Sequence, residues 1–219
     1  MPKQRRSVDW DACLKELAAG AQALKLRLAP AARAAMIDYL KMLELWNATH
    51  NLTAVRDPHA MVTRHLLDSL AVLDFVTGDR LVDVGSGPGL PGLVLAIARP
   101  KLQVTLVEAN GKKAAFLRHV RRRLQLANVT VVQQRVEGWS PEGRFDCVVC
   151  RAFAAAAECA RLTGHLVAPD GRLLLMKGRD PGAELADLPP DFRAVDRVVL
   201  TVPGLEAERH LAILEPGLI

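Results

Sequence analysis

The sequence lacks the features that mark secreted and membrane-spanning proteins. Its four cysteines, which are too few and too irregularly spaced for a disulfide framework, are Cys13, Cys147, Cys150 and Cys159. The apolar run at residues 93–98, as long as any in the chain, is far shorter than the ~20 residues that span a membrane. Charged residues interrupt the stretch after the basic N-terminus, so we expect no secretory signal. We therefore expect a cytoplasmic protein that binds no membrane.

What the sequence does have is ample apolar material and a moderate excess of positive charge. The 219 residues are 50% apolar, which suffices for a buried core in one large domain, or in a domain with an extension. Such a composition excludes an intrinsically disordered chain. The 29 Lys and Arg residues outnumber the 24 Asp and Glu residues, which gives a formal net charge of +5. This balance favours an acidic or polyanionic partner without identifying one.

The N-terminal third of the chain has the apolar spacing of helices. Ser7 is a candidate N-cap for a first helix whose apolar positions extend from Trp10 to Leu24. Pro30 suits the first turn of a second helix, and a polar stretch at residues 47–57 follows that helix. The pattern therefore predicts two helices joined to the rest of the chain by a polar loop.

A third helix is expected at the end of this region. Asp57 and the proline after it have the order of an N-cap and a first-turn proline. The helical spacing extends to about Val76, and Gly78 is a typical residue beyond a helix C-terminus. The pattern changes after this point, which predicts a helical extension at 1–77 and a main domain at 78–219.

In the main domain, short β-branched runs alternate with helical segments. We expect strands at 81–84, 104–108, 129–134, 145–149 and 172–177, and helices at 90–98, 112–126 and 154–166. This alternation implies right-handed crossovers and a mostly parallel sheet. Two more extended segments, 194–202 and 210–214, have too few residues between them for a crossover helix, so they should pair antiparallel at one sheet edge. The predicted fold is an α/β, Rossmann-like sheet of seven strands.

The most informative segment reads LVDVGSGPGLPG and joins the first strand to the first helix of this domain. Its glycines at Gly85, Gly87 and Gly89 let the backbone turn tightly and let a ligand lie against main-chain atoms. The helix expected from Leu90 offers free N–H groups to an anion or a carboxylate. Glu108, at the end of the second strand, can accept hydrogen bonds from both ribose hydroxyls of a nucleoside. Together these features predict a site for a nucleoside cofactor.

Two classes of cofactor are possible ligands of this loop. Dinucleotide-binding folds have the pattern G-x-G-x-x-G, whereas this loop has G-x-G-x-G and an acidic residue, Asp83, in the strand before it. A carboxylate is unfavourable beside a pyrophosphate and tolerated beside a sulfonium cation. The pattern therefore resembles the first motif of S-adenosylmethionine-dependent methyltransferases. A nucleotide-dependent oxidoreductase and a plain strand-to-helix turn stay open as alternatives.

Three further segments narrow the choice: WNATHNLTAVRDPHAMVTRHLLDSL, FDCVVCRAFA and ERHLAIL. With the glycine loop they resemble the bacterial small-subunit ribosomal RNA methyltransferase family RsmG, formerly called glucose-inhibited division protein B, from Trp46 to Leu214. The resemblance implies a class I methyltransferase fold and transfer from S-adenosylmethionine to guanine N7 in 16S rRNA. The substrate would be free 16S rRNA or the small ribosomal subunit, and we expect the protein to be a monomer. Cys150 stands where the family commonly has Ser before an Arg-Ala pair.

The resemblance implies a set of cofactor contacts at Gly85, Leu90, Val136, Glu137 and Arg151. The general methyltransferase pattern adds Asp83, Gly87, Gly89 and Glu108. Guanine N7 carries a lone pair and no proton, so it needs no general base, and we assign no catalytic residue. Catalysis should rest on in-line positioning and exclusion of water. A binding module that senses cofactor and ribosome without catalysis is a further alternative.

Several polar residues are candidates for substrate binding: Asn51, Thr53, His65, Asp68, Lys177, Arg121, Arg122 and Arg123. Each also has a plainer interpretation. Asn51 and Thr53 are typical turn residues, and His65 and Asp68, three apart on a helix, can pair at its surface. Lys177 can simply be solvated beyond its strand. The run from Arg121 to Arg123 can bind RNA phosphates, or it can form the solvated outer face of a helix.

The pair Cys147 and Cys150 forms a C-x-x-C motif, which is typical of redox and metal sites. Residues three apart on a strand point to opposite faces, and no second pair or nearby His completes a metal site. We therefore expect buried thiols and no metal.

Overall fold

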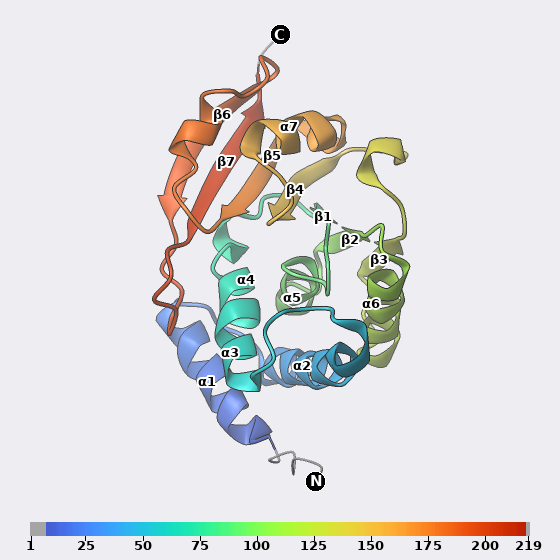
Figure 1. Ribbon diagram of the computed structural model, residues 1–219, viewed down its shortest axis with the longest axis vertical. Helices are drawn as coiled ribbons and strands as arrows, with labels where there is room; N and C mark the ends of the chain where they lie inside the picture. Colours follow the sequence, from blue (N-terminus) through green and yellow to red (C-terminus); the bar gives the residue numbers. More distant parts are fainter. Residues whose placement is uncertain (1–7, 218–219) are drawn as a thin grey trace.

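Seven strands form one sheet in the order β3-β2-β1-β4-β5-β7-β6 (Figure 1). The computed structural model describes residues 8–217. The strands are β1 (Arg80–Val84), β2 (Gln103–Val107), β3 (Val129–Val132), β4 (Phe145–Arg151), β5 (Val167–Lys177), β6 (Phe192–Val199) and β7 (His210–Pro216). Strands β1 to β5 are parallel, whereas β7 runs antiparallel to both neighbours. The predicted α/β sheet and its C-terminal antiparallel hairpin are confirmed, with β7 one place inside the edge strand β6.

Helices cover both faces of this sheet. The α-helices are α1 (Trp10–Ala23), α2 (Pro30–His50), α3 (Pro58–Met61), α4 (Asp68–Leu70), α5 (Gly92–Ala98), α6 (Gly111–Arg123) and α7 (Ala156–Thr163). A π-helical turn (Val62–Leu67) joins α3 to α4, and 3₁₀ turns occur at Leu73–Phe75, Val136–Gly138, Gly164–Leu166 and Gly182–Leu185. Within the part of the chain that the structure describes, no helix is both long enough and apolar enough to cross a bilayer.

Alternating side chains of the strands build two apolar cores, one on each face of the sheet. Leu81 and Cys147 belong to the core beneath α5, α6 and the N-terminal helices. Val82 and Cys150 belong to the core beneath α7. The two cysteines thus point to opposite faces, as predicted. All four cysteines are buried free thiols, and residues 8–217 contain no cluster of side chains that could hold a metal ion.

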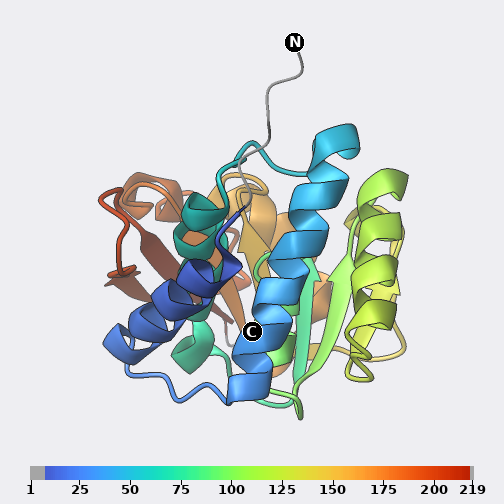
Figure 2. The ribbon, with the colours of Figure 1, turned by 90° about the horizontal axis from the view of Figure 1, so that it is seen from below.

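The first two helices pack on one face of the sheet and share its core (Figure 2). Helix α1 has Asp9 as its N-cap, and the carboxylate accepts a hydrogen bond from the Ala12 N–H at 2.9 Å. The predicted cap, Ser7, lies outside the described residues. The division into an extension at 1–77 and a domain at 78–219 stays a prediction. The N-terminal helices share one apolar core with the sheet.

Helix α2 is longer than predicted and the third helix is less regular. Helix α2 runs to His50, past the buried Asn47, so it includes the start of the expected polar loop. Asp57 caps α3 as predicted, accepting from the Ala60 N–H at 2.7 Å. The helix then widens into the π-helical turn and ends six residues before Val76.

The predicted role of Gly78 as a helix C-terminal residue is wrong. Gly78 follows a 3₁₀ turn and has a φ of +67°. A Cβ at this position would overlap the side chain of Asp146, whose carboxylate accepts the N–H groups of Asp79 and Arg80 at 2.9 Å. The glycine is therefore required for a close approach between the start of β1 and β4.

Candidate functional site

The glycine loop turns sharply at the carboxyl end of β1. Gly85, Gly87 and Gly89 have φ values of +69°, +57° and +101°, a region that favours glycine. A Cβ on Gly85 would lie 2.8 Å from the ring of Phe153. Helix α5 begins at Gly92, two residues later than predicted. Gly85 is partly exposed, whereas Gly87 and Gly89 are buried, and the loop lies at the edge where parallel sheets bind ligands.

Glu108 links the loops that follow β1 and β2. Its Oε2 accepts from the Gly87 N–H at 2.8 Å, and its Oε1 accepts from the Asn110 N–H at 2.8 Å. Each carboxylate oxygen has a second lone pair, so both can also accept from a hydroxyl group. The predicted ribose contact thus fits a carboxylate that is already fixed in place.

Asp83 is fully buried beneath the same loop. Its Oδ2 accepts from the Gly92 N–H at 2.8 Å, which fastens the start of α5, while Oδ1 has no partner. Burial raises the pKa of this carboxyl to about 7, against the opposing effects of the Gly92 hydrogen bond and the positive charge of Arg151. A buried acceptor without a partner is the kind of group that a bound ligand can satisfy.

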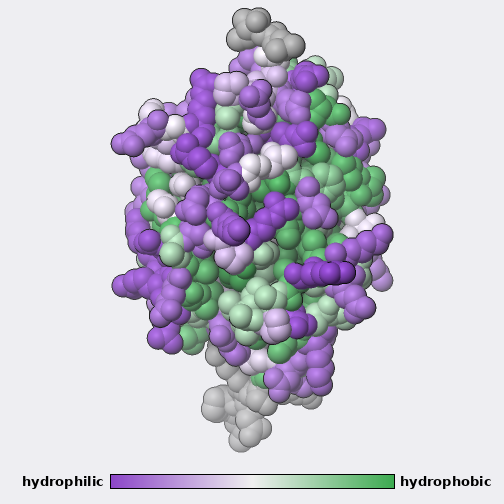
Figure 3. Space-filling model, turned by 180° about the vertical axis from the view of Figure 1, so that it is seen from behind, coloured by the Kyte–Doolittle hydropathy of each residue, from purple (hydrophilic) through white to green (hydrophobic). Residues whose placement is uncertain are grey.

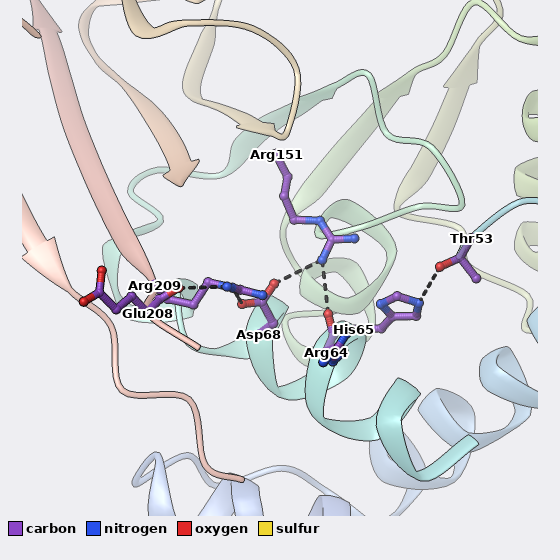
Figure 4. A network of polar contacts seen from close by, with 7 residues as sticks. All are labelled: Thr53, Arg64, His65, Asp68, Arg151, Glu208 and Arg209. Carbon is purple, nitrogen blue, oxygen red and sulfur yellow. Dashed lines mark hydrogen bonds and ion pairs between the residues drawn. The ribbon is translucent and has the colours of Figure 1, made fainter. Parts of the chain in front are cut away.

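Arg151, at the end of β4, enters a network that joins distant parts of the chain (Figure 4). Its Nη1 donates to Asp68 Oδ2 at 3.1 Å and to the Arg64 carbonyl at 3.3 Å. The other oxygen of Asp68 accepts from Arg209 Nε at 2.8 Å. The Asp68 side chain is only 3% exposed, so this carboxylate lies between two guanidinium groups in a nearly dry environment.

The predicted pairing of His65 with Asp68 is wrong, because the backbone between them is π-helical and wider than an α-helix. His65 Nε2 instead lies 3.0 Å from Thr53 Oγ1. Burial lowers the pKa of His65 to about 4, so the ring is neutral at neutral pH. The Thr53 N–H donates to Asn47 Oδ1 at 2.9 Å, which also ties this loop to α2.

Asn51 has the turn role that its residue type favours. It ends α2 with a φ of +48°, and its Oδ1 accepts from Arg56 Nη2 at 3.1 Å. Together with the Thr53 contacts, this bond shapes the loop between α2 and α3. The loop passes in front of the carboxyl edge of the sheet in the view of Figure 1, on the same side as the glycine loop.

Two other groups of substrate candidates are not brought to this network. Lys177 donates to the Ala154 carbonyl at 2.8 Å and to Glu184 Oε2 at 2.7 Å, so it braces the segments around α7. The run from Arg121 to Arg123 forms the last turn of α6, which starts at the carboxyl edge and therefore ends at the opposite edge.

Seen from behind, the molecule shows an apolar area surrounded by hydrophilic side chains (Figure 3).

Among the remaining cofactor candidates, Leu90 is buried in the core beneath the N-terminal helices. Val136 and Glu137 form a 3₁₀ turn after β3, beyond the carboxyl end of that strand. Two further residues at this edge were not foreseen. Tyr39 of α2 donates its buried hydroxyl to the Pro88 carbonyl at 3.0 Å, and Arg209 holds Asp68. No sequence motif marks Tyr39, and no local pattern links Arg209 to a residue 141 positions away.

Comparison with protein families gives one match over most of the chain. The family described as GidB, rRNA small subunit methyltransferase G, matches residues 32–212. A relative from Stenotrophomonas maltophilia (strain K279a), named Ribosomal RNA small subunit methyltransferase G, is 52% identical over 176 residues, which are 80% of this chain and 83% of that protein. A relative of the same name from Pseudomonas aeruginosa (strain LESB58) is 48% identical over 200 residues, 91% of this chain and 94% of that protein.

Solved structures show the same fold at low sequence identity. The crystal structure of the Bacillus subtilis M1A22 tRNA methyltransferase TrmK has a TM-score of 0.55 and 16% identity, covering 68% of this chain and 65% of that one. The N-methyltransferase NodS from Bradyrhizobium japonicum WM9, solved with S-adenosyl-l-homocysteine, has a TM-score of 0.55 and 13% identity. That match covers 80% of this chain and 100% of NodS. The fold is that of class I methyltransferases.

Proposed function

This chain belongs to the rRNA small subunit methyltransferase G family, and from that premise we propose that it methylates N7 of a guanosine in 16S rRNA. Methyl transfer to small-subunit rRNA, with S-adenosylmethionine as cofactor, follows from the family. The oxidoreductase interpretation of the glycine loop is therefore set aside. The observation in this structure that supports the proposal best is the glycine-rich loop whose Gly87 N–H is fixed by Glu108.

The residues at the carboxyl edge fit S-adenosylmethionine. Glu108 retains lone pairs for ribose hydroxyls, and the unpartnered Oδ1 of Asp83 lies beneath the loop. We propose that these two residues hold the cofactor together with Gly85, Gly87, Gly89, Leu90, Val136, Glu137 and Arg151. When bound, S-adenosylmethionine supplies an electrophilic methyl group on a positively charged sulfur.

The protein's own contribution is positioning rather than proton transfer. His65 is buried, neutral and bonded to Thr53, so it stiffens the loop between α2 and α3. Asp83 is enclosed beneath the glycine loop and bonded to the Gly92 N–H. Neither group needs to take a proton, because guanine N7 is unprotonated at neutral pH. Rigid loops of this kind orient the reactants and exclude water.

The test is a comparison of 16S rRNA from cells that contain the gene with rRNA from cells that lack it. Nucleoside mass spectrometry should find one N7-methylguanosine that disappears with the gene and returns with the intact gene. Loss of a different modification would contradict the N7 assignment. No change, with S-adenosylmethionine binding intact, would favour the alternative of a binding module that does not catalyse.

We also propose that the protein works as a monomer in the cytoplasm, where ribosomal RNA is found. The support is that Asp68, Glu108 and Thr53 each find hydrogen-bond partners within one chain. Light scattering of the purified protein should give a mass close to that of one 23.8 kDa chain. A stable dimer at micromolar concentration would contradict the monomer.

A further inference from the structure

The loop between β6 and β7 reaches the Arg151 network through one side chain. Residues 200–209 run from the end of β6 back over the N-terminal helices, and Pro203–Ala207 line a cavity of about 930 Å³ together with α1 and the π-helical turn. Leu205 packs against the core of that face. The loop ends at Arg209, whose Nε donates to Asp68 Oδ1 at 2.8 Å (Figure 4).

Two further hydrogen bonds fix Arg209 in addition to its contact with Asp68. Its Nη1 donates to the Glu208 carbonyl at 2.8 Å, and its own carbonyl accepts from the Leu200 N–H at 2.8 Å. The side chain of Arg209 is only 23% exposed. Both the main chain and the head group of this arginine are therefore held in one place.

Asp68 divides its two oxygens between two arginines. Oδ1 accepts from Arg209 and Oδ2 from Arg151, and the 3% exposure of the carboxylate leaves little room for water to replace either. A two-bond fork from Arg151 would bring a second positively charged guanidinium onto the oxygen that already accepts from Arg209, and repulsion between the like charges disfavours it. A carboxylate with both oxygens free offers a guanidinium the two-bond fork that it prefers.

We propose that Arg209 is a positioning residue for methyl transfer. By occupying Oδ1 of Asp68, it limits Arg151 to one bond with that carboxylate and leaves the other N–H groups of the guanidinium for the cofactor. Without Arg209, the Arg151 guanidinium forms two bonds with the two oxygens of Asp68 and is no longer held for the cofactor. This proposal rests on the cofactor contact of Arg151 proposed above.

The test is calorimetric titration of the full-length protein with S-adenosylmethionine. Arg209→Met should weaken binding by about tenfold, the scale of one charge-assisted hydrogen bond. Arg209→Lys, which keeps one donor for Oδ1, should recover part of the loss. Arg193→Met is the matched control, because it removes an ion pair with Glu215 from the same β-hairpin and should leave affinity unchanged.

A second measurement separates positioning from damage to the fold. In an Asp68→Asn background Arg209 has no carboxylate to hold, so Arg209→Met should add little further loss. In steady state, Arg209→Met should raise KM for S-adenosylmethionine and leave KM for RNA near that of the parent. Unchanged cofactor affinity in Arg209→Met, or an equal loss in Arg193→Met, would overturn the proposal. A parent protein that binds no S-adenosylmethionine would instead overturn the proposed function, and this inference with it.

Discussion

Single residues at the carboxyl edge are constrained by both conformation and space. Gly85 combines a φ of +69° with a Phe153 ring 2.8 Å from where a Cβ would lie. Gly85→Val should therefore abolish S-adenosylmethionine binding, since the new side chain strains the turn and fills the surface on which a ligand would lie. Calorimetry checks the binding, and circular dichroism checks that the sheet persists. Affinity equal to that of the parent would remove the loop from the cofactor site.

His65 gives a stability prediction whose sign is fixed by its burial. The pKa of His65 is about 4 in the folded protein and near 6.5 when unperturbed. Between these values the unfolded chain binds a proton that the folded protein does not, so acidification destabilises the fold. The parent should therefore lose about 2 kcal/mol more than His65→Gln between pH 7 and pH 5.

Urea unfolding of both proteins at the two pH values measures this difference directly. Asp83 acts in the opposite direction, because its raised pKa favours the protonated folded state in acid, but it is present in both proteins and cancels in the comparison. Equal pH dependence in the parent and in His65→Gln would contradict the buried, neutral ring.

At the scale of elements, strand positions were predictable and helix details were not. The strands follow from short β-branched runs such as Val129–Val132, and the hairpin follows from the few residues between β6 and β7. The π-helical turn has no sequence signal, and it is the reason that His65 and Asp68 do not pair. The partners of Asp68 lie 83 and 141 positions away, so only the tertiary fold can reveal them.

Helix α6 supports a prediction about RNA binding. Its last turn, Arg121 to Arg123, lies at the edge of the sheet opposite the glycine loop. Replacing the three arginines with alanine should leave cofactor affinity and the salt dependence of RNA binding unchanged, as for a solvated helix face. Filter binding across a range of salt concentrations checks this expectation. A slope that falls by about 0.7–0.9 for each lost phosphate contact would show that RNA reaches this edge.

At the scale of the whole molecule, the N-terminal helices and the sheet act as one scaffold for the site. Tyr39 of α2 bonds to the Pro88 carbonyl in the glycine loop, and Asp68 of α4 joins β4 to the loop before β7. The sequence predicted the family and the turn at the glycine loop, while the cofactor contacts of Asp83 and Glu108 stay predictions. It could not predict how the N-terminal helices support that loop, because these contacts depend on packing between distant segments.

The most direct test of the account is methyl transfer by the purified protein. The protein is incubated with S-adenosylmethionine and with small subunits, or with free 16S rRNA, from cells that lack the gene, and the nucleosides are then analysed by mass spectrometry. The account predicts N7-methylguanosine at a single site, formed by the parent and not by Gly85→Val. Methyl groups on a ribose or an exocyclic amine, or no transfer to either substrate by protein that binds the cofactor, would contradict it.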